Sequence, residues 1–417
     1  MTLYLTNTLN RTKEPFNSRQ PHMVKCFTCG PSIYKRPHVG NFATFLFEDV
    51  LQRYLEYSGY EVQRVINFTD VEDKALEEAK EKALSLTELT EPVEEQFYQD
   101  AASLRIRLPS RIPRSSTTID EAVRLIQTLL ARGYAYWHDN DVFYDPLKFE
   151  GFGKLFGLDM RKWPKKKRRF RRDTYPGERW NLGDFVLWHG HRAEKDGAVY
   201  WETPLGKGRP AWNVQDSAII SSSLGYEIDI ACGGVDNLYR HHDYTLAIME
   251  AVSQRTLARY WLHGEHVLID GKKMSKSRGN ILYLDDLKND GLTETEVRFY
   301  LIYGHYRKKK NLSLTQMRNR AHRLKAVRDI IQKFLPGSDT STSGSKDAAV
   351  RRWVDKLIPQ FEERMDDDID VKGAFDTVES IVLKLDGIGG SHGLHKEDRV
   401  ALYQSLEKID DVLQVLL

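Results

Sequence analysis

The sequence predicts an α/β protein in which a doubly wound parallel sheet carries an insertion and is followed by an all-α helical bundle. Three observations support this prediction. The first seventy residues read as strand, helix and strand. Strand patterns then give way to helices after residue 74 and recur at 226–231 and 265–270, and helical periodicity alone continues after about residue 311. A chain of 417 residues also has room for two or three domains, at about 150 residues each.

The first strand-helix-strand unit begins with a short apolar run at residues 23–29 (MVKCFTC), which stops at Gly30 and Pro31. A helical pattern begins after Pro37, and Gly59 ends it. Residues 60–69 (YEVQRVINFT) read as a second strand, which makes the unit typical of a parallel sheet. Apolar residues recur in the helix at spacings of three and four, which predicts one buried face of Phe42, Phe45, Leu46, Val50, Leu51, Tyr54 and Leu55.

The middle of the chain predicts an interruption of the sheet. Helical patterns fill residues 74–133, and strand-like pieces lie near 142–145 and 184–188. Strand signals return at 226–231 (YEIDIA) and 265–270 (EHVLID), with a helix that starts near His241 between them. The sheet is therefore expected to resume there, after an insertion at about 135–210. Two stretches in the C-terminal part, 336–345 and 387–393, favour loops because they are rich in Gly, Ser and Thr.

Composition narrows the class of protein. Apolar residues make up 41% and charged residues 29%, as in a globular protein that is neither disordered nor membrane-spanning. The net charge of +2 excludes a generic polyanion binder, so a nucleic-acid site must come from local clustering. We find no apolar run of about 18 residues and no signal peptide, which predicts a cytoplasmic protein with no membrane contact. Three cysteines cannot form a disulfide framework in a chain of this size. We also expect the protein to be a monomer.

The tetrapeptide His38-Val39-Gly40-Asn41 lies where the first strand passes into its helix, the position at which parallel-sheet proteins bind nucleotides. Gly40 allows a ligand to approach the backbone closely, and the N–H groups of a helix start attract phosphate. The imidazole of His38 can donate a hydrogen bond to a phosphate oxygen. Taken alone, this segment favours an ordinary helix start over a nucleotide site.

A second segment, residues 271–280 (GKKMSKSRGN), follows the strand predicted at 265–270. Lys273 and Lys276 stand three apart, with serines around them and glycines at both ends. Such a segment forms a mobile cationic loop that can close over a triphosphate and follow charge as it develops. The alternative is a solvated basic turn, but the full KMSKS sequence after a strand favours phosphate binding.

With these two segments the chain resembles the class I aminoacyl-tRNA synthetases, whose signatures are a HIGH-type tetrapeptide and KMSKS. HVGN is a variant of the first, and KMSKS matches the second in every letter. Further segments are similar, in the same order, to the cysteinyl-tRNA synthetase family: CGPSIY at 29–34, PHVGNFATFLFEDVLQRYL at 37–55, INFTDVEDK at 66–74, DFVLW at 184–188, GKGRPAWN at 206–213, GGVD at 233–236, the histidine pair at 241–242 and FEERMDDDID at 361–370. The resemblance implies a Rossmann-type catalytic domain over 1–310, with the insertion, and a helical bundle domain over 311–417.

The resemblance implies ATP-dependent activation of an amino acid as an aminoacyl adenylate, followed by transfer to tRNA, as in a cysteine--tRNA ligase. His38 and Asn41 would hold the phosphates of ATP, with Mg²⁺ on the pyrophosphate. Lys273 and Lys276 would stabilise the pentavalent transition state. Asp236 would accept hydrogen bonds from the ribose hydroxyls.

The remaining expected contacts divide between the two substrates. Gly40, Gly234 and Ser275 would line the ATP site. Thr69 stands where the family contacts its amino acid, and Cys29 and Trp212 join it in the expected amino acid site.

The family also implies a zinc ion that binds the cysteine thiolate and is held by two Cys, one His and one Glu. This chain keeps only Cys29 and His241 of that set. Asp216 stands in place of the second cysteine and Thr245 in place of the glutamate. The resemblance therefore implies a reduced set of Cys29, Asp216 and His241, with Thr245 as a weak fourth ligand.

An alternative metal set that uses Cys26, Cys232 or His242 stays open, although Cys26 and Cys29 on one strand would point to opposite faces. Without zinc, selection of a thiol by a metal is lost, and the pocket would admit an amino acid other than cysteine.

The acceptor is the second open question. The family continues into an anticodon-reading region that this chain is expected to lack, and a paralogous ligase of the mycothiol pathway joins cysteine to an amino-sugar instead of tRNA. The basic stretch 164–172 (PKKKRRFRR), with Trp163 and Phe170, points toward RNA, because it could neutralise phosphates and stack on bases. A ligase that acylates a small amine or carrier, and a catalytically silent RNA-binding homologue, are the alternatives.

Overall fold

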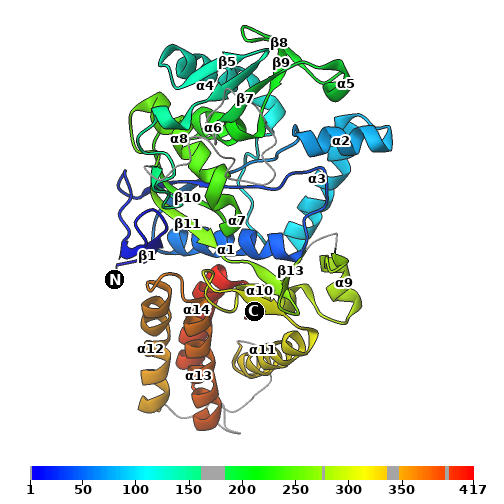
Figure 1. Ribbon diagram of the computed structural model, residues 1–417. Helices are drawn as coiled ribbons and strands as arrows, with labels where there is room; N and C mark the ends of the chain where they lie inside the picture. The colour runs from blue at the N-terminus through cyan, green and yellow to red at the C-terminus, as the bar shows by residue number, and fades with distance from the viewer. Residues whose placement is uncertain (1, 161–183, 275–277, 336–346, 390–393) are drawn as a thin grey trace.

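The computed structural model describes residues 2–160, 184–274, 278–335, 347–389 and 394–417 (Figure 1). Within these ranges a parallel sheet forms the centre of the molecule, in the strand order β11-β10-β3-β4. All neighbouring pairs are parallel, and Cys26 of β3 lies between Ile230 of β10 and Arg64 of β4. The strands are β3 (Met23–Thr28), β4 (Glu61–Ile66), β10 (Ile228–Gly234) and β11 (Ala258–Gly264). The predicted fold class is confirmed.

Each face of this sheet packs against helices. Helix α1 (Val39–Tyr57) connects β3 to β4, and all seven predicted apolar residues of its face are buried. Val24, Cys26, Ile230 and Leu262 belong to the core on that side. The alternate residues of the same strands, such as Phe27 and Trp261, belong to the core on the other side, under α6 (Trp212–Ser223) and α8 (Asp243–Ser253). Burial on both faces explains the continuous apolar runs of β3 and β10.

The chain between β4 and β10, which includes the insertion predicted at about 135–210, contains helices and an antiparallel sheet in the order β5-β6-β7-β9-β8 (Figure 1). Strands β6 and β7 agree with the sequence prediction near 142–145 and 184–188, whereas β5, β8 and β9 were not predicted. Their bounds are β5 (Ala135–His138), β6 (Asp141–Tyr144), β7 (Phe185–Gly190), β8 (Trp201–Thr203) and β9 (Gly206–Pro210). The helices are α2 (Asp73–Lys82), α3 (Leu86–Ser103), α4 (Ile119–Ala131) and α5 (Ala193–Asp196), with 3-10 turns at Ser115–Thr117 and Pro146–Lys148.

The prediction that residues 265–270 resume the parallel sheet is wrong. Strand β11, at residues 258–264, pairs with β10 in the parallel sheet instead. Its sequence, ARYWLHG, did not predict a strand because polar residues and a glycine flank a short apolar run. Strand β12 (Val267–Ile269) instead joins β13 (Lys272–Lys273) and β14 (Lys310–Leu312) in a separate small sheet. At the N-terminus, β1 (Tyr4–Asn7) and β2 (Thr12–Pro15) form a hairpin.

The C-terminal part is helical and lies at the opposite end of the molecule from the insertion (Figure 1). Helices α9 (Leu284–Asn289) and α10 (Glu294–Ile302) precede β14. They are followed by α11 (Leu314–Phe334), α12 (Ala348–Met365), α13 (Val371–Gly389) and α14 (Lys396–Leu413). These helices share one continuous apolar core with α1. Among the described helices, none has both the length and the hydropathy that crossing a bilayer requires.

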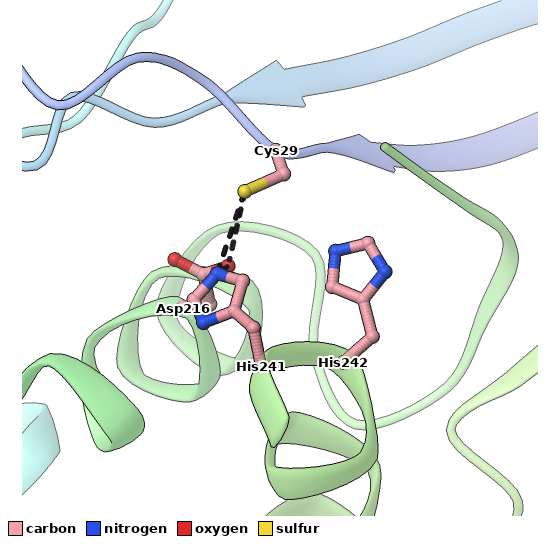
Figure 2. Close-up of side chains that lie close together, drawn as sticks. All are labelled: Cys29, Asp216, His241 and His242. Carbon is pink, nitrogen blue, oxygen red and sulfur yellow. Dashed lines mark hydrogen bonds and ion pairs between the residues drawn. The ribbon is translucent and has the colours of Figure 1, made fainter. Parts of the chain in front are cut away.

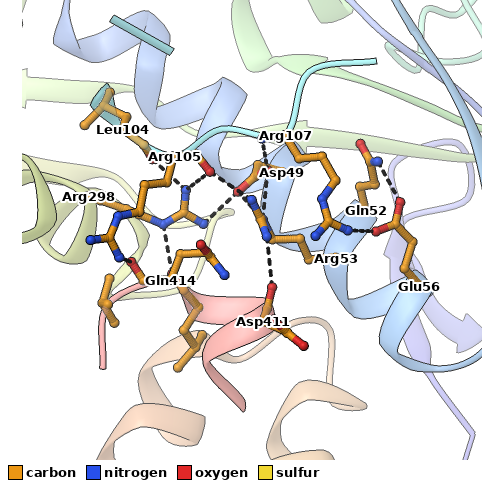
Figure 3. A network of polar contacts seen from close by, with 12 residues as sticks. Asp49, Gln52, Arg53, Glu56, Leu104, Arg105, Arg107, Arg298, Asp411 and Gln414 are labelled. Carbon is orange, nitrogen blue, oxygen red and sulfur yellow. Dashed lines mark hydrogen bonds and ion pairs between the residues drawn. The ribbon is translucent and has the colours of Figure 1, made fainter. Parts of the chain in front are cut away.

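A buried ionic network joins α1 to this helical part (Figure 3). The Arg298 guanidinium of α10 donates to Asp49 Oδ2 of α1 at 2.6 Å and to the carbonyl oxygens of Leu104 and Leu413 at 2.8 Å each. Arg53, one turn after Asp49, donates to the Asp411 carbonyl at 3.0 Å. Both Arg298 and Asp49 are 0% exposed. The network therefore fixes α1 against α10 and the end of α14.

Candidate functional site

Helix α1 begins at the HVGN segment with a reciprocal cap. His38 Nδ1 accepts a hydrogen bond from the Asn41 backbone N–H at 3.2 Å, and Asn41 Oδ1 accepts from the His38 backbone N–H at 3.0 Å. Because Nδ1 is an acceptor, the neutral imidazole carries its proton on Nε2. Burial lowers the pKa of His38, and Lys273 acts in the same direction while Asp236 opposes it. His38 is thus a neutral ring with an N–H donor at the start of a helix.

The KMSKS segment lies against this helix start. The Val39 backbone N–H donates to the Leu282 carbonyl at 2.9 Å, just beyond the segment. A Cβ atom added at Gly40 would lie 2.7 Å from Met274 Cε and 3.0 Å from the His38 ring. Two segments more than two hundred residues apart therefore meet at one place, and the absence of a side chain at Gly40 leaves room for the Met274 methyl group and the His38 ring.

Lys273 connects the KMSKS segment to the end of β10. Its Nζ atom lies 3.4 Å from Asp236 Oδ2, and both side chains are 54% exposed. The Lys273 carbonyl accepts hydrogen bonds from Arg278 and Asn280 at 3.3 Å each, which holds the two ends of the segment together. A Cβ at Gly234 would lie 2.6 Å from Asp236 Oδ1. His38, Gly40, Gly234, Asp236 and Lys273 therefore share one region at the carboxyl ends of the parallel strands, where such sheets bind ligands.

The predicted metal ligands lie beside this region, buried at the end of β3 (Figure 2). Cys29 Sγ is 3.4 Å from His241 Nε2 and 3.7 Å from Asp216 Oδ2, and those last two atoms are 2.7 Å apart. Burial raises the pKa of the Cys29 thiol well above its ordinary value, and Asp216 raises it further. The thiolate form thus needs a positive partner to exist here.

Other predicted residues support this cluster. The Trp212 indole stacks on the His241 ring with 3.9 Å between centroids and 11° between planes. Asn67 donates from Nδ2 to Asp216 Oδ1 at 3.1 Å and to Thr69 Oγ1 at 3.3 Å. Its Oδ1 atom accepts from the Gly30 N–H at 2.8 Å. Thr69 and Trp212 are therefore connected to this cluster, Thr69 through Asn67 and Trp212 through the His241 ring.

The structure separates the alternative metal ligands. Cys26 and Cys232 lie in the core under α1, on the face of the sheet opposite Cys29, so they are outside the cluster. The Thr245 hydroxyl, expected as a weak fourth ligand, donates to the His241 carbonyl at 3.0 Å instead. His242 is the member that joins Cys29, Asp216 and His241, and one donor atom from each of the four lies within 4.8 Å of the others.

This donor set fits a zinc ion. A tetrahedral ion with ligand bonds of about 2.0–2.3 Å keeps its donors roughly 3.3–3.8 Å apart, close to the distances from Cys29 Sγ. One thiol, one carboxylate and two imidazoles are ligand types that zinc accepts. The 2.7 Å contact between His241 and Asp216 is a hydrogen bond that a shared cation would replace.

Some expected residues lie outside the described part of the chain, namely Ser275, Lys276 and the basic stretch 164–172 with Trp163. Other contacts were missed by sequence reasoning. Asn67 and Met274 stand inside segments quoted for the resemblance, yet neither the hydrogen bonds of Asn67 nor the contact of Met274 with α1 has a local pattern that reveals it.

Comparison with known proteins agrees with this geometry. Residues 15–322 match the family model described as tRNA synthetases class I (C) catalytic domain. "Cysteine--tRNA ligase" of Chlamydia pneumoniae is 38% identical over 99% of this chain and 86% of that protein. The protein of the same description from Protochlamydia amoebophila is 33% identical over the same shares.

A solved structure supports the fold. Mycobacterium tuberculosis methionyl-tRNA synthetase in complex with methionyl-adenylate superposes with a TM-score of 0.68 at 16% identity, over 94% of this chain and 91% of that one. From the family model and the identity across nearly its whole length, the chain belongs to the class I aminoacyl-tRNA synthetases, in the cysteine--tRNA ligase family.

Proposed function

We propose that the chain activates cysteine with ATP as cysteinyl adenylate and transfers the cysteinyl group to tRNA. The observation that carries the ATP part is the meeting of the HVGN helix start, the KMSKS segment and Asp236 at the ends of the parallel strands. The observation that supports cysteine is the buried cluster around Cys29, next to this region. Family membership supports both parts.

In the activation step, a carboxylate oxygen of the amino acid attacks the α-phosphorus of ATP, and the bond to pyrophosphate breaks. Negative charge then moves onto the leaving pyrophosphate, with which Mg²⁺ would travel. Lys273 and Lys276 would neutralise that charge, and the Nε2–H group of His38 would donate to a phosphate oxygen. Asn41 would hold His38 in place through the reciprocal cap. Asp236 would exchange its contact with Lys273 for the ribose hydroxyls.

The amino acid would lie between Cys29, Thr69 and Trp212. Cys29, Asp216 and His241 would hold the zinc ion. When bound, that ion would supply an electrophilic partner for the substrate thiolate, and so distinguish a thiol from a hydroxyl.

We propose catalytic residues 1–310 with a connective insertion at about 135–210, and a helical domain at 311–417. The tRNA would contact the helical part, where Lys308, Lys309, Arg320 and Lys372 line one hollow with a volume of about 470 Å³, together with the carboxylates of residues 367, 368 and 370.

The test is ATP–pyrophosphate exchange with each of the standard amino acids in turn. We expect exchange with cysteine and none with serine. Exchange with a different amino acid would overturn the cysteine assignment, and exchange with none would overturn adenylation. Charging of total tRNA at low salt then decides the acceptor, because a ligase for a small amine would exchange pyrophosphate but leave tRNA uncharged.

Gly40 provides a second test of the proposed site. We expect Gly40→Ala to lower the exchange rate by about tenfold to a hundredfold, because the new Cβ would press on the His38 ring and on Met274, which follows Lys273. Met274→Ala removes the side-chain end that the Cβ would meet. The double variant should therefore recover much of the lost rate, and a double variant as slow as Gly40→Ala would contradict this contact.

A further inference from the structure

We infer that His242 is the fourth zinc ligand of this chain, and that His263 and Thr8 orient it. The inference rests on the proposed zinc site and extends it to residues outside the reduced set of Cys29, Asp216 and His241. It replaces Thr245, the residue at the family's glutamate position.

His242 meets the geometric requirement for a ligand. Its side chain is 1% exposed, and its Nε2 atom has no hydrogen-bond partner among the described residues. In Figure 2 a ring nitrogen of His242 faces the gap toward Cys29, while Cys29 and His241 approach the same gap from the other side. A Cβ at Gly233 would lie 2.6 Å from His242 Cε1, so a glycine at that position leaves the ring room to lie here. A buried imidazole nitrogen aimed at a thiol, a carboxylate and a second imidazole would give the zinc ion a fourth protein ligand, and the substrate thiolate would then bind as a fifth ligand, a number to which zinc can expand.

The other nitrogen of His242 is held by a chain of hydrogen bonds. Nδ1 lies 2.8 Å from His263 Nε2, and His263 Nδ1 lies 3.0 Å from Thr8 Oγ1. Both rings are buried, and a single hydrogen bond joins His242 Nδ1 to His263 Nε2, so one proton lies between them. If this proton is on His242 Nδ1, then His242 Nε2 is unprotonated and its lone pair is aimed at the cluster. The opposite tautomer would bury an N–H group without an acceptor, which is the costlier state.

Metal-bound histidines commonly donate their other N–H group to such a partner, which fixes the tautomer and the ring orientation. His263 and Thr8 come from strand β11 and from the end of β1, distant in sequence from the four ligands. Thr245 has no comparable role, because its hydroxyl donates a hydrogen bond to the His241 carbonyl, just before α8. The structure thus assigns His263 and Thr8 as positioning residues.

The experiment uses the full-length protein and measures zinc content by mass spectrometry, zinc affinity by competition with a chelator, and the number of imidazoles by X-ray absorption at the zinc edge. The matched pair is Thr8→Val and Thr245→Val, the same loss of a hydroxyl at two positions. We expect Thr245→Val to keep the wild-type affinity within about twofold, and Thr8→Val to lose about tenfold to a hundredfold. His242→Gln should lose more than Thr8→Val, and the zinc it retains should show one imidazole instead of two.

Circular dichroism of each variant distinguishes the loss of a zinc ligand from unfolding. The number of imidazoles on zinc is measured on the wild-type protein, so a variant that fails to fold does not affect that result. The inference is overturned if wild-type protein binds no zinc or shows a single imidazole, or if Thr245→Val loses zinc while His242→Gln keeps it. Failure of the proposed function gives a different result. A protein that holds zinc through two imidazoles but shows no cysteine-dependent exchange would contradict the function and leave the ligand assignment intact.

Discussion

Replacement of Lys273 by alanine is expected to lower the rate of cysteine-dependent ATP–pyrophosphate exchange by about a hundredfold to a thousandfold, the usual effect of removing one donor that stabilises transition-state charge. Lys273 Nζ lies beside Asp236 and acts electrostatically on His38, so it is placed to meet the phosphates of ATP. The KM for cysteine should change little, because the Cys29 cluster is separate. Steady-state exchange at varied ATP and cysteine measures both quantities.

Lys272→Ala is the matched control. Lys272 precedes Lys273 in β13, and consecutive residues of a strand point to opposite faces. This variant removes the same charge from the same strand, so it should keep the exchange rate within about twofold. Equal losses in the two variants would mean that the net charge of the segment matters and that Lys273 has no specific position.

Replacement of Arg298 by methionine is expected to lower the free energy of unfolding by about 3–5 kcal/mol, since it leaves the buried Asp49 carboxylate without its main partner. Burial alone would raise the pKa of Asp49, but Arg298 and Arg53 overcome that effect and hold it below the ordinary value. The carboxylate therefore stabilises the fold at neutral pH. This contribution is lost as the pH falls through the lowered pKa of the folded state. Urea unfolding at pH 7 should show the full difference, which should shrink below about pH 4.

Arg351→Met supplies the comparison for an exposed pair. Arg351 binds Asp355 one turn away on α12 with both side chains more than half exposed, and its other ion pair, with Asp398, is long at 3.9 Å, so its loss should cost less than about 1 kcal/mol. The triple variant Asp49→Leu, Arg53→Met and Arg298→Met should recover part of the stability lost in the single variant, because no unpaired charge of this network then remains inside. A small effect of Arg298→Met at pH 7 would contradict the view that this network joins α1 to the helical part.

Local patterns predicted the elements that are locally determined. The apolar spacing from Phe42 to Leu55 identified α1, and the apolar run at 23–29 identified β3, because a buried face repeats within a few residues. The same patterns could not reveal that α1 also buries Asp49 and Arg53. Those residues are polar, and they are inside only because α10 and α14 cover them. Strand β11 was missed for a related reason, since its identity depends on its neighbour β10.

The candidate site divides in the same way. Its residue types were visible as motifs, since HVGN, KMSKS and GGVD each have a fixed local form. Their meeting through Gly40, Met274 and Leu282 depends on the tertiary fold, and no spacing in the sequence encodes it. The role inferred for His242 could be recognised only from the structure, because in the sequence its neighbour His241 stands at the family's ligand position. Only the direction of the His242 ring and its contact with His263 distinguish the two.

The central claim is that the two signature segments form one site that joins a carboxylate to the α-phosphorus of ATP. Its most direct test is rapid quenching of the enzyme mixed with cysteine and ATP labelled at the α-phosphate, in the presence of pyrophosphatase and without tRNA. The account predicts that labelled cysteinyl adenylate accumulates on wild-type enzyme and is consumed when tRNA is added, and that Lys273→Ala forms it far more slowly. Folded wild-type protein that binds ATP and cysteine but yields no labelled adenylate would contradict the account.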